Sequence, residues 1–375
     1  MLDLEGEALR DQVIALCARG VDRPLEDAVF DALARRIFAF QFERNGPYAA
    51  YCRRRGRTPD DVAHWSEIPA VPTAAFKEVR LVAGRVEAAE AVFRTSGTTR
   101  AERRGEHYLL DVTAYHAALL AGFAGYVLPD RAELPLLSLV PPGQQMTDSS
   151  LAHMVAVLVE RVGAQGSAHY ADVQRGIDDD ALAAALRRFT DGRTPVCLLG
   201  TSLAFLHWLD RLRARGERFR LPAGSRLMDT GGFKGRRREV PAEELRSAYQ
   251  ELVGVPGSHV VNEYGMTELS SQAYDAGLRD WHAGVSGRSP RKLAPPWMRV
   301  LVADPETLEV ARPGAVGILR LVDLANLSSV VAVQTEDLGG EVEDGFVVLG
   351  RATGAPPRGC SIAMDLLLSA VEERR

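Results

Sequence analysis

The chain has 375 residues, of which 46% are hydrophobic and 25% are charged, and its formal net charge is -5. This length and composition predict a large buried core in two or so structural units, and they exclude the disordered and fibrous classes. The mild negative charge gives no reason to expect nucleic acid as a partner, and no apolar run is long enough to predict a membrane span.

The N-terminus is acidic where a secretory signal is basic, which predicts a cytoplasmic protein. Apolar spacing predicts helices over residues 1 to about 55, and a proline-containing connector follows at 68–73. A short strand is expected at 91–94. Helices are then expected at 114–126, 151–162, 180–189, 203–215 and 241–252, and strands at 134–140, 195–199, 226–229 and 259–262. This alternation predicts an α/β fold with mostly parallel sheets flanked by helices.

The pattern changes near residue 297, beyond which short strands dominate. They are expected at 300–303, 316–321, 330–333 and 346–349. The sequence therefore predicts two domains. Residues 1–295 form the α/β core with its helical N-terminal segment, and residues 296–375 form a small β-rich subdomain that ends in a tail around Cys360.

A loop rich in hydroxyl groups follows the strand at 91–94, with the sequence Thr95-Ser96-Gly97-Thr98-Thr99. Hydroxyl and backbone N–H donors can wrap a polyphosphate, and glycine permits close approach of the backbone. Arg100, Arg103 and Arg104 add positive charge nearby. The chain lacks the P-loop pattern G-x-x-x-x-G-K-[ST]. An ordinary Ser/Thr-rich turn explains the run equally well.

A second motif, Asn262-Glu263-Tyr264-Gly265-Met266-Thr267-Glu268, follows the strand at 259–262. It therefore lies at the carboxyl end of a strand, where open α/β sheets bind ligands. Tyr264 could stack on adenine, Thr267 could bond a phosphate, and Glu268 could hold Mg²⁺ as an oxygen ligand. The alternative is a helix N-cap formed by Thr267.

Further motifs lie near the C-terminus. Asp337 in Thr335-Glu336-Asp337 could accept both ribose hydroxyls, although aspartate is also common in turns. Gly350-Arg351 and Arg358-Gly359-Cys360-Ser361 follow. The four cysteines have neither metal-ligand nor redox-motif spacing. A guanidinium near Cys360 could lower the pKa of its thiol, whereas the alternative is an incidental, unreactive cysteine.

In this order and spacing, the motifs resemble the adenylate-forming superfamily that includes acyl-CoA synthetases. They resemble more closely the acyl-protein synthetase (LuxE) family, from about residue 50 to residue 365. The runs that carry this resemblance are Val71–Lys77, Asp229–Lys234, Asn262–Glu268 and Arg358–Ser361. The resemblance implies that ATP and Mg²⁺ are bound and that Cys360 carries the acyl group as a thioester. The residues implied to bind the nucleotide are Ser96, Gly97, Thr98, Thr99, Tyr264, Gly265, Met266, Asp337 and Arg351, with Thr267 acting on a phosphate and Glu268 on the metal.

The sequence departs from the superfamily pattern at several positions. Arg100 to Arg104 replace the usual Gly and Lys of the phosphate loop, Glu336 replaces a glycine, and Thr353 replaces an aspartate. Only 15 residues follow Cys360, so a C-terminal lid domain with its catalytic lysine is not expected. Lysine is rare here, which makes Lys77 and Lys234 the candidates for a cation at the α-phosphate.

The function implied is ATP-dependent activation of a carboxylic acid, with a fatty acid preferred, as acyl-AMP. The acyl group would pass to Cys360 and then to a partner that resembles an acyl-CoA reductase or a carrier. Adenylation of an aromatic or amino acid in a biosynthetic pathway stays open, as does a non-catalytic relative that binds AMP or an acid. A third alternative is an α/β-hydrolase. In that enzyme Ser202, within Gly200-Thr201-Ser202-Leu203-Ala204, would be the nucleophile, with His207, His259 and Asp229 as possible partners.

Overall fold

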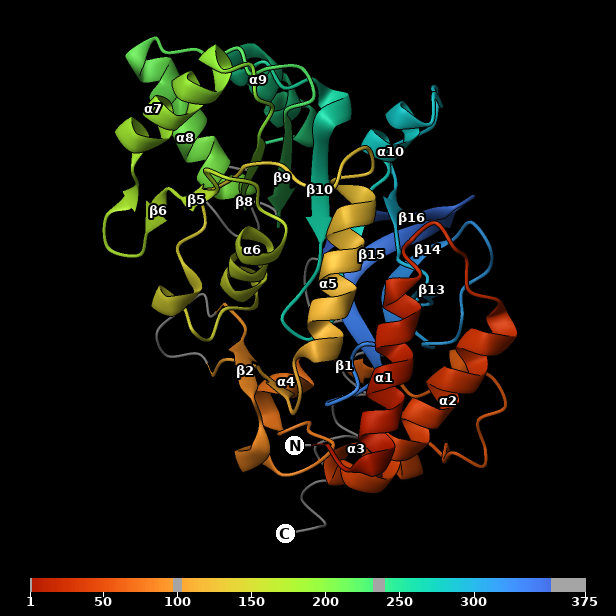
Figure 1. Ribbon diagram of the computed structural model, residues 1–375. Coiled ribbons are helices and arrows are strands. Elements are labelled where there is room, and N and C mark those ends of the chain that lie inside the picture. Colours follow the sequence, from red (N-terminus) through yellow and green to blue (C-terminus); the bar gives the residue numbers. More distant parts are fainter. Residues whose placement is uncertain (1, 97–102, 232–239, 352–375) are drawn as a thin grey trace. The chain divides into compact units, whose positions relative to one another are not determined.

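The chain is described here by a computed structural model, and two compact units form the described part of it (Figure 1). The described residues are 2–96, 103–231 and 240–351. Unit 1 consists of Met1–Gly122, Met266–Gln272 and Arg291–Arg375, and unit 2 consists of Phe123–Gly265 and Ala273–Pro290. Both units combine helices with strands, so the predicted α/β class is confirmed. The predicted domain boundary after residue 295 stays a prediction.

Unit 1 opens with α1 (Leu4–Ala18), α2 (Asp27–Arg44) and α3 (Gly46–Arg54), where the sequence predicts helices. The Asp3 side chain caps α1 by accepting the N–H of Gly6 at 2.9 Å. Gln41 on α2 is fully buried and satisfies backbone groups far along the chain: it donates to the carbonyl of Asn326 at 2.8 Å and accepts the N–H of Val331 at 2.7 Å. These bonds tie α2 to the segment that leads into β15.

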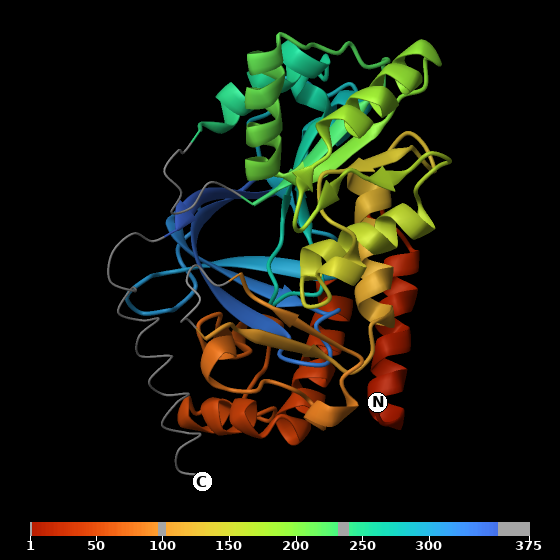
Figure 2. The same ribbon diagram turned by 90° about the vertical axis from the view of Figure 1, so that its left-hand side faces the viewer.

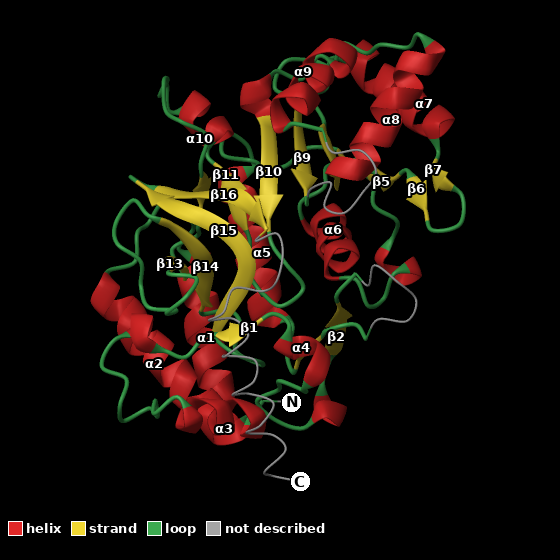
Figure 3. Cartoon of the chain, turned by 180° about the vertical axis from the view of Figure 1, so that it is seen from behind, coloured by secondary structure: helices red, strands yellow, loops and turns green. Residues whose placement is uncertain are grey.

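The sheet of unit 1 is an antiparallel meander in the order β13-β14-β15-β16, and β12 pairs with β16. Its register shifts between Ile318 and Arg320 and again between Leu338 and Gly339, and such bulges bend strands. Figure 2 and Figure 3 show β14 and β15 curving along their length. The strands are β12 (Lys292–Leu293), β13 (Met298–Ala303), β14 (Val316–Asp323), β15 (Ala332–Val342) and β16 (Gly345–Arg351).

The segment predicted as a connector contains a strand of this sheet. β1 (Val71–Pro72) pairs in parallel with β15, with Val71 opposite Val333 and Pro72 opposite Gln334. Separately, β2 (Ala91–Arg94) and β3 (Glu106–Leu109) form an antiparallel hairpin. The other elements of this region are η1 (Trp65–Glu67), α4 (Ala75–Glu78), η2 (Val86–Ala88) and α5 (Thr113–Tyr126), which ends inside unit 2.

Unit 2 is built on a parallel sheet in the order β10-β9-β8-β4-β5, and β11 is antiparallel to β10. Strands and helices alternate from β8 to β10, and this alternation makes the sheet parallel, as the sequence predicts. The strands are β4 (Leu136–Ser138), β5 (Ala168–His169), β8 (Cys197–Thr201), β9 (Arg226–Thr230), β10 (Val260–Tyr264) and β11 (Ala273–Asp275), with a small hairpin of β6 (Ala171–Asp172) and β7 (Gly176–Ile177). The helices are α6 (Ser150–Arg161), α7 (Asp179–Asp191), α8 (Ser202–Arg215), α9 (Ala242–Val253) and α10 (Gly277–His282), with short turns η3 (Gly143–Gln145) and η4 (Gly257–His259).

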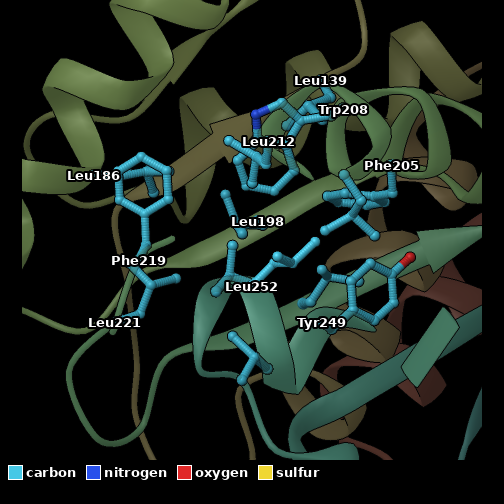
Figure 4. Packing of buried hydrophobic residues seen from close by; sticks show 14 of the residues in the cluster. Leu139, Leu186, Leu198, Phe205, Trp208, Leu212, Phe219, Leu221, Tyr249 and Leu252 are labelled. Atoms are coloured by element: carbon cyan, nitrogen blue, oxygen red, sulfur yellow. The ribbon is translucent and has the colours of Figure 1, made fainter. Parts of the chain in front are cut away.

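A hydrophobic cluster joins helices α7, α8 and α9 to this sheet. Figure 4 shows Trp208 and Leu212 of α8 and Leu252 of α9 around Leu198 of β8. Each such side chain contributes about 1.5–3 kcal/mol by leaving water. The cluster therefore fixes the parallel strands whose carboxyl ends carry the second sequence motif. Nowhere in the described ranges is a helix both long and apolar enough to span a membrane.

Candidate functional site

The loop that begins with Thr95-Ser96-Gly97-Thr98-Thr99, here called the hydroxyl loop, connects β2 to β3. Hydrogen bonds between Thr95 and Gly105 close its base, here called the neck. The N–H of Thr95 donates to the carbonyl of Gly105 at 2.9 Å, and the N–H of Gly105 donates to Thr95 Oγ1 at 2.8 Å. Arg104 donates from Nε to the carbonyl of Thr95 at 2.6 Å, so this guanidinium braces the neck. Ser96 is exposed directly beyond the neck. The other predicted loop residues, Gly97, Thr98 and Thr99, lie outside the described residues.

Gly105 lets the neck pack against α4. A Cβ at this position would lie 3.1 Å from Cγ2 of Thr95 and 3.3 Å from Cβ of Phe76, both closer than ordinary contact. Lys77 follows Phe76 on α4, and its side chain is exposed. The base of the hydroxyl loop and Lys77 are thus carried by two elements in contact.

The parallel pairing of β1 with β15 brings a second motif to this region. The pairing continues beyond β1, where the N–H of Thr73 donates to the carbonyl of Gln334 at 3.0 Å. Because the two strands run in the same direction, the chain leaves β1 toward Lys77 on the side where β15 continues into Glu336 and Asp337. Two predicted site segments, far apart in sequence, are therefore neighbours within unit 1.

Asp337 is buried, and its main chain and side chain are both held. Its N–H donates to Thr335 Oγ1 at 3.0 Å. On the neighbouring strand, Arg351 lies opposite Asp337 in register. Nε of Arg351 is 3.8 Å from Asp337 Oδ1, and its Nη1 is 3.6 Å from Glu336 Oε2. Asp337, which is predicted to bind the ribose, and Arg351, which is predicted to bind the nucleotide, are therefore in contact.

Thr267 and Glu268 form a turn, closed where the N–H of Leu269 donates to the carbonyl of Met266 at 3.2 Å. No helix follows, so the alternative interpretation of Thr267 as a helix N-cap is wrong. Immediately beyond the turn, the buried Asp323 carboxylate accepts the N–H groups of Ser270 at 2.9 Å and of Ser271 at 2.8 Å.

Glu268 is buried within unit 1, with 8% of its surface exposed. Burial raises the pKa of its carboxyl group to about 7, while the positive charges of Arg351 and Lys77 act in the opposite direction. The charge of Glu336 adds to the increase. Lys77, Arg351, Glu336 and Glu268 therefore share one electrostatic environment.

The Glu268 carboxylate fits a role as a ligand of Mg²⁺. A desolvated carboxylate whose pKa is raised gains most from a cation that restores its charged form. Across the described ranges, no group of three or more His, Cys, Asp or Glu side chains could hold a metal ion. Mg²⁺ is commonly held by one or two carboxylates together with phosphate oxygens of a bound nucleotide, and Glu268 would supply one such carboxylate.

In unit 2, buried and half-buried polar groups cross-link the carboxyl ends of β9 and β10. Asn262 Nδ2 donates to Asp229 Oδ1 at 2.7 Å, and the Tyr249 hydroxyl donates to Asp229 Oδ2 at 3.0 Å. The Thr230 hydroxyl donates to the carboxylate of Glu263. Burial raises the pKa of Asp229, against the effect of these hydrogen bonds. This network fixes the strand end from which the chain continues to Tyr264 and Gly265.

Within the described part of unit 2, the Ser202 hydroxyl bonds backbone carbonyls and not a catalytic side chain. Ser202 is buried at the start of α8, and its hydroxyl donates to the carbonyl of Gly231 at 3.2 Å. His207 is exposed on the same helix. His259 precedes β10, whereas Ser202 follows β8. Because the strands are parallel, the two residues lie at opposite ends of the strands. The geometry does not favour the hydrolase alternative.

The described structure places most predicted site residues, but in different units. In unit 1 are Ser96, Lys77, Met266, Thr267, Glu268, Asp337 and Arg351, and in unit 2 are Tyr264 and Gly265. Lys234 and Cys360 lie outside the described residues. The roles assigned to all these residues stay predictions.

Sequence reasoning missed the residues that hold the Thr267–Glu268 turn. The ring of His107 lies 2.7 Å from the Thr267 carbonyl through Nδ1, and Asn326 Nδ2 donates to the Glu268 carbonyl at 2.9 Å. The sequence offers a hint only for His107, which follows the hydroxyl loop closely. Asp323 and Asn326 carry no local signal.

The sequence matches the family model described as acyl-protein synthetase, LuxE, over residues 22–369. It is 21% identical over 313 residues to the long-chain-fatty-acid–luciferin-component ligase of Aliivibrio fischeri, a match that covers 82% of this chain and 78% of that protein. The corresponding ligase of Vibrio harveyi is 20% identical over 349 residues, which are 90% of this chain and 88% of that protein.

Among solved structures, the chain is similar to an open conformation of 2-hydroxyisobutyryl-CoA ligase in complex with 2-HIB-AMP and CoA. The TM-score is 0.62 at 14% identity, over 88% of this chain and 71% of that one. At this identity the similarity establishes the shared fold, which confirms the fold that the sequence motifs imply.

Proposed function

This chain belongs to the acyl-protein synthetase (LuxE) family, and from that premise we propose that it uses ATP to activate a carboxylic acid as acyl-AMP and transfers the acyl group to a thiol. The observation that carries the proposal is the electrostatic environment of the Thr267–Glu268 turn. There the charges of Lys77 and Arg351 act on the buried carboxyl group of Glu268. Such a combination of cations and a metal-binding carboxylate suits a polyphosphate.

The first step joins the acid to AMP. A carboxylate oxygen attacks the α-phosphorus of ATP, the bond from that phosphorus to the bridging oxygen breaks, and pyrophosphate leaves. The protein forms no covalent bond in this step, so it acts by positioning and by charge. Lys77 is the described candidate for the cation at the α-phosphate, and Asp337 is the candidate for the ribose hydroxyls.

Glu268 is the proposed ligand of Mg²⁺, and Thr267 the proposed donor to a phosphate. When bound, the ion offsets the negative charge of the phosphates and of the departing pyrophosphate. Asn326 and His107 hold the main chain of this turn, which keeps its side chains oriented. ATP as a substrate favours the cytoplasmic location that the sequence predicts.

The second step transfers the acyl group. The thiolate of Cys360 attacks the acyl carbonyl carbon, and AMP leaves with the electrons of the carbon–oxygen bond. A thiolate, rather than a thiol, is the nucleophile, and the neighbouring Arg358 would favour that form. Both curated relatives carry a long-chain fatty acid in their names, so a long-chain fatty acid is the proposed substrate. The proposed acceptor is a protein that resembles an acyl-CoA reductase or a carrier.

ATP–pyrophosphate exchange against a panel of acids tests this function. The panel includes long-chain and short-chain fatty acids, benzoate and amino acids, and long-chain fatty acids should give the fastest exchange. Exchange confined to benzoate or to amino acids would replace the fatty acid with the aromatic or amino acid substrate. Binding of ATP without exchange for any acid would contradict catalysis.

Variants separate the two steps. Glu268→Ala should abolish exchange, because the phosphates lose their metal ligand. Cys360→Ala should keep exchange but lose the acyl group that intact-mass spectrometry detects on the wild-type chain. Ser202→Ala is the control and should keep both activities; loss of all activity in this variant would instead support a hydrolase.

A further inference from the structure

His107 is fully buried on β3 and links segments that are distant in sequence. Its Nδ1 is 2.7 Å from the carbonyl oxygen of Thr267, 160 positions away. Its Nε2 is 2.8 Å from Oδ1 of Asn326, 219 positions away. The ring also meets that of Phe76 edge to face, with centroids 6.1 Å apart. One side chain therefore contacts the turn, the segment that supports the turn, and α4.

His107 and its partner Asn326 hold successive peptide groups of the turn. His107 engages the carbonyl of Thr267, and Asn326 donates to the carbonyl of the next residue, Glu268. A carbonyl oxygen and an amide oxygen both only accept, and burial lowers the pKa of the ring to about 4, so the neutral ring has one proton to donate. The tautomer with the proton on Nδ1 makes the hydrogen bond to Thr267. The direction of these two carbonyls fixes the backbone from which the Thr267 and Glu268 side chains project.

The strand that carries His107 also bounds the hydroxyl loop. β3 begins at Glu106, directly after Gly105, which closes the neck of the loop with Thr95. His107 lies opposite Phe93 in the hairpin register. The Thr95–Gly105 pair and the Thr267–Glu268 turn are thus both held within two residues of position 107.

We propose that His107 is a positioning residue that locks the Thr267–Glu268 turn to the β2–β3 hairpin, so that the turn holds the phosphates of ATP in a fixed relation to unit 1. This inference rests on the proposed function. His107 touches neither nucleotide nor acid in this scheme. Its loss should therefore weaken ATP use while sparing the acid.

The variants His107→Asn and His107→Leu form a matched pair of nearly equal size. Both leave similar space beside Phe76, but only asparagine keeps a donor near the Nδ1 position. In ATP–pyrophosphate exchange, His107→Leu should raise the KM for ATP about tenfold or more, because the half-buried carbonyl of Thr267 loses its donor and the turn loses its fixed orientation. His107→Asn should stay within about threefold of wild type. The KM for the acid should be unchanged in both variants.

A purely structural role predicts a different result. Both variants would then lose thermal stability and active fraction equally, without a change in either KM, and that result would overturn the proposal. Tyr108→Phe, the neighbouring position on β3, removes the hydrogen bond from its hydroxyl to Glu106 and should leave the KM for ATP unchanged. An increase in that variant equal to the increase in His107→Leu would also overturn it.

The two hypotheses fail separately. If the wild-type chain exchanges pyrophosphate and His107→Leu keeps the wild-type KM for ATP, only the positioning role is wrong. If the wild-type chain shows no exchange, calorimetric titration measures the Kd of each variant for Mg·ATP. About tenfold weaker binding by His107→Leu than by His107→Asn supports the positioning role. Equal Kd values for the two variants refute it. His107→Phe, which keeps an aromatic ring but no donor, replaces His107→Leu if that variant does not fold.

Discussion

At the scale of single residues, two carboxyl groups near the Thr267–Glu268 turn, those of Glu268 and Glu336, stand out. Glu268 is buried, and burial raises the pKa of its carboxyl group to about 7. Glu336 adds a negative charge beside Arg351, with its Oε2 3.6 Å from Nη1 of the arginine. Both features have consequences that can be measured without knowing the acid substrate.

Glu268 should make stability depend on pH. Between its usual pKa of 4.5 and about 7, the folded protein keeps a proton that the unfolded chain releases, so the free energy of unfolding falls as pH rises. Glu268→Gln removes this effect. Without nucleotide, the variant should gain stability over wild type as pH rises from 5 to 8, by up to roughly 3 kcal/mol. Urea denaturation measures the difference, and a difference that stays constant with pH would contradict the assignment.

Glu336 should weaken ATP binding by repulsion and by competing for Arg351. Glu336→Gln should lower the KM for ATP about two- to fivefold at low salt, and added salt should shrink the effect. Glu341→Gln, an exposed position on the same strand, is the control and should change the KM little. A KM for ATP that stays unchanged or rises in Glu336→Gln would contradict this interpretation.

At the scale of elements, the neck of the hairpin depends on close packing with α4. Gly105 is the position where β3 approaches Phe76, and the space beside it does not admit a methyl group without movement. The hydrogen bonds between Thr95 and Gly105 then fix the neck itself. Packing and hydrogen bonding thus act at the same two residues.

Gly105→Ala should therefore disturb both stability and ATP use. Overpacking of this kind costs about 1–3 kcal/mol, so the melting temperature should fall and the KM for ATP should rise. Gly277→Ala on α10 is the matched control, because a Cβ there would meet no atom within 4 Å. Thermal denaturation and exchange kinetics measure both effects. An unchanged KM in a destabilised Gly105→Ala would separate the neck from ATP binding.

At the scale of the whole molecule, the second motif is divided between the two units. Tyr264 and Gly265 belong to unit 2, whereas Met266 to Gln272 belong to unit 1, to which the chain returns for good at Arg291. A motif that reads as one stretch of sequence is therefore supported by two separate sets of contacts. The Asp229 network supports its first part, and Asp323 and Asn326 support its second part.

The sequence predicts the repetitive parts of this architecture and misses the parts made by distant pairing. Strand–helix alternation from β8 to β10 is visible because each element is long enough to show its period. β1 and β12 have two residues each, and β3 begins with Glu106 and His107, so none of them shows an apolar pattern. Likewise, the order of the motifs indicates the chemistry of the site. The roles of His107, Asp323 and Asn326 arise from partners that no local pattern reveals.

The parallel pairing of β1 with β15 has a consequence for how the chain folds during synthesis. Val71 cannot meet Val333 until nearly the whole chain has left the ribosome, whereas the parts of unit 2 are all available once Pro290 has emerged. Non-local pairing of this kind is slow and exposes unpaired strands while it waits. The residues of β1 are thus made early, yet they find their place in the sheet only after β15 has been made.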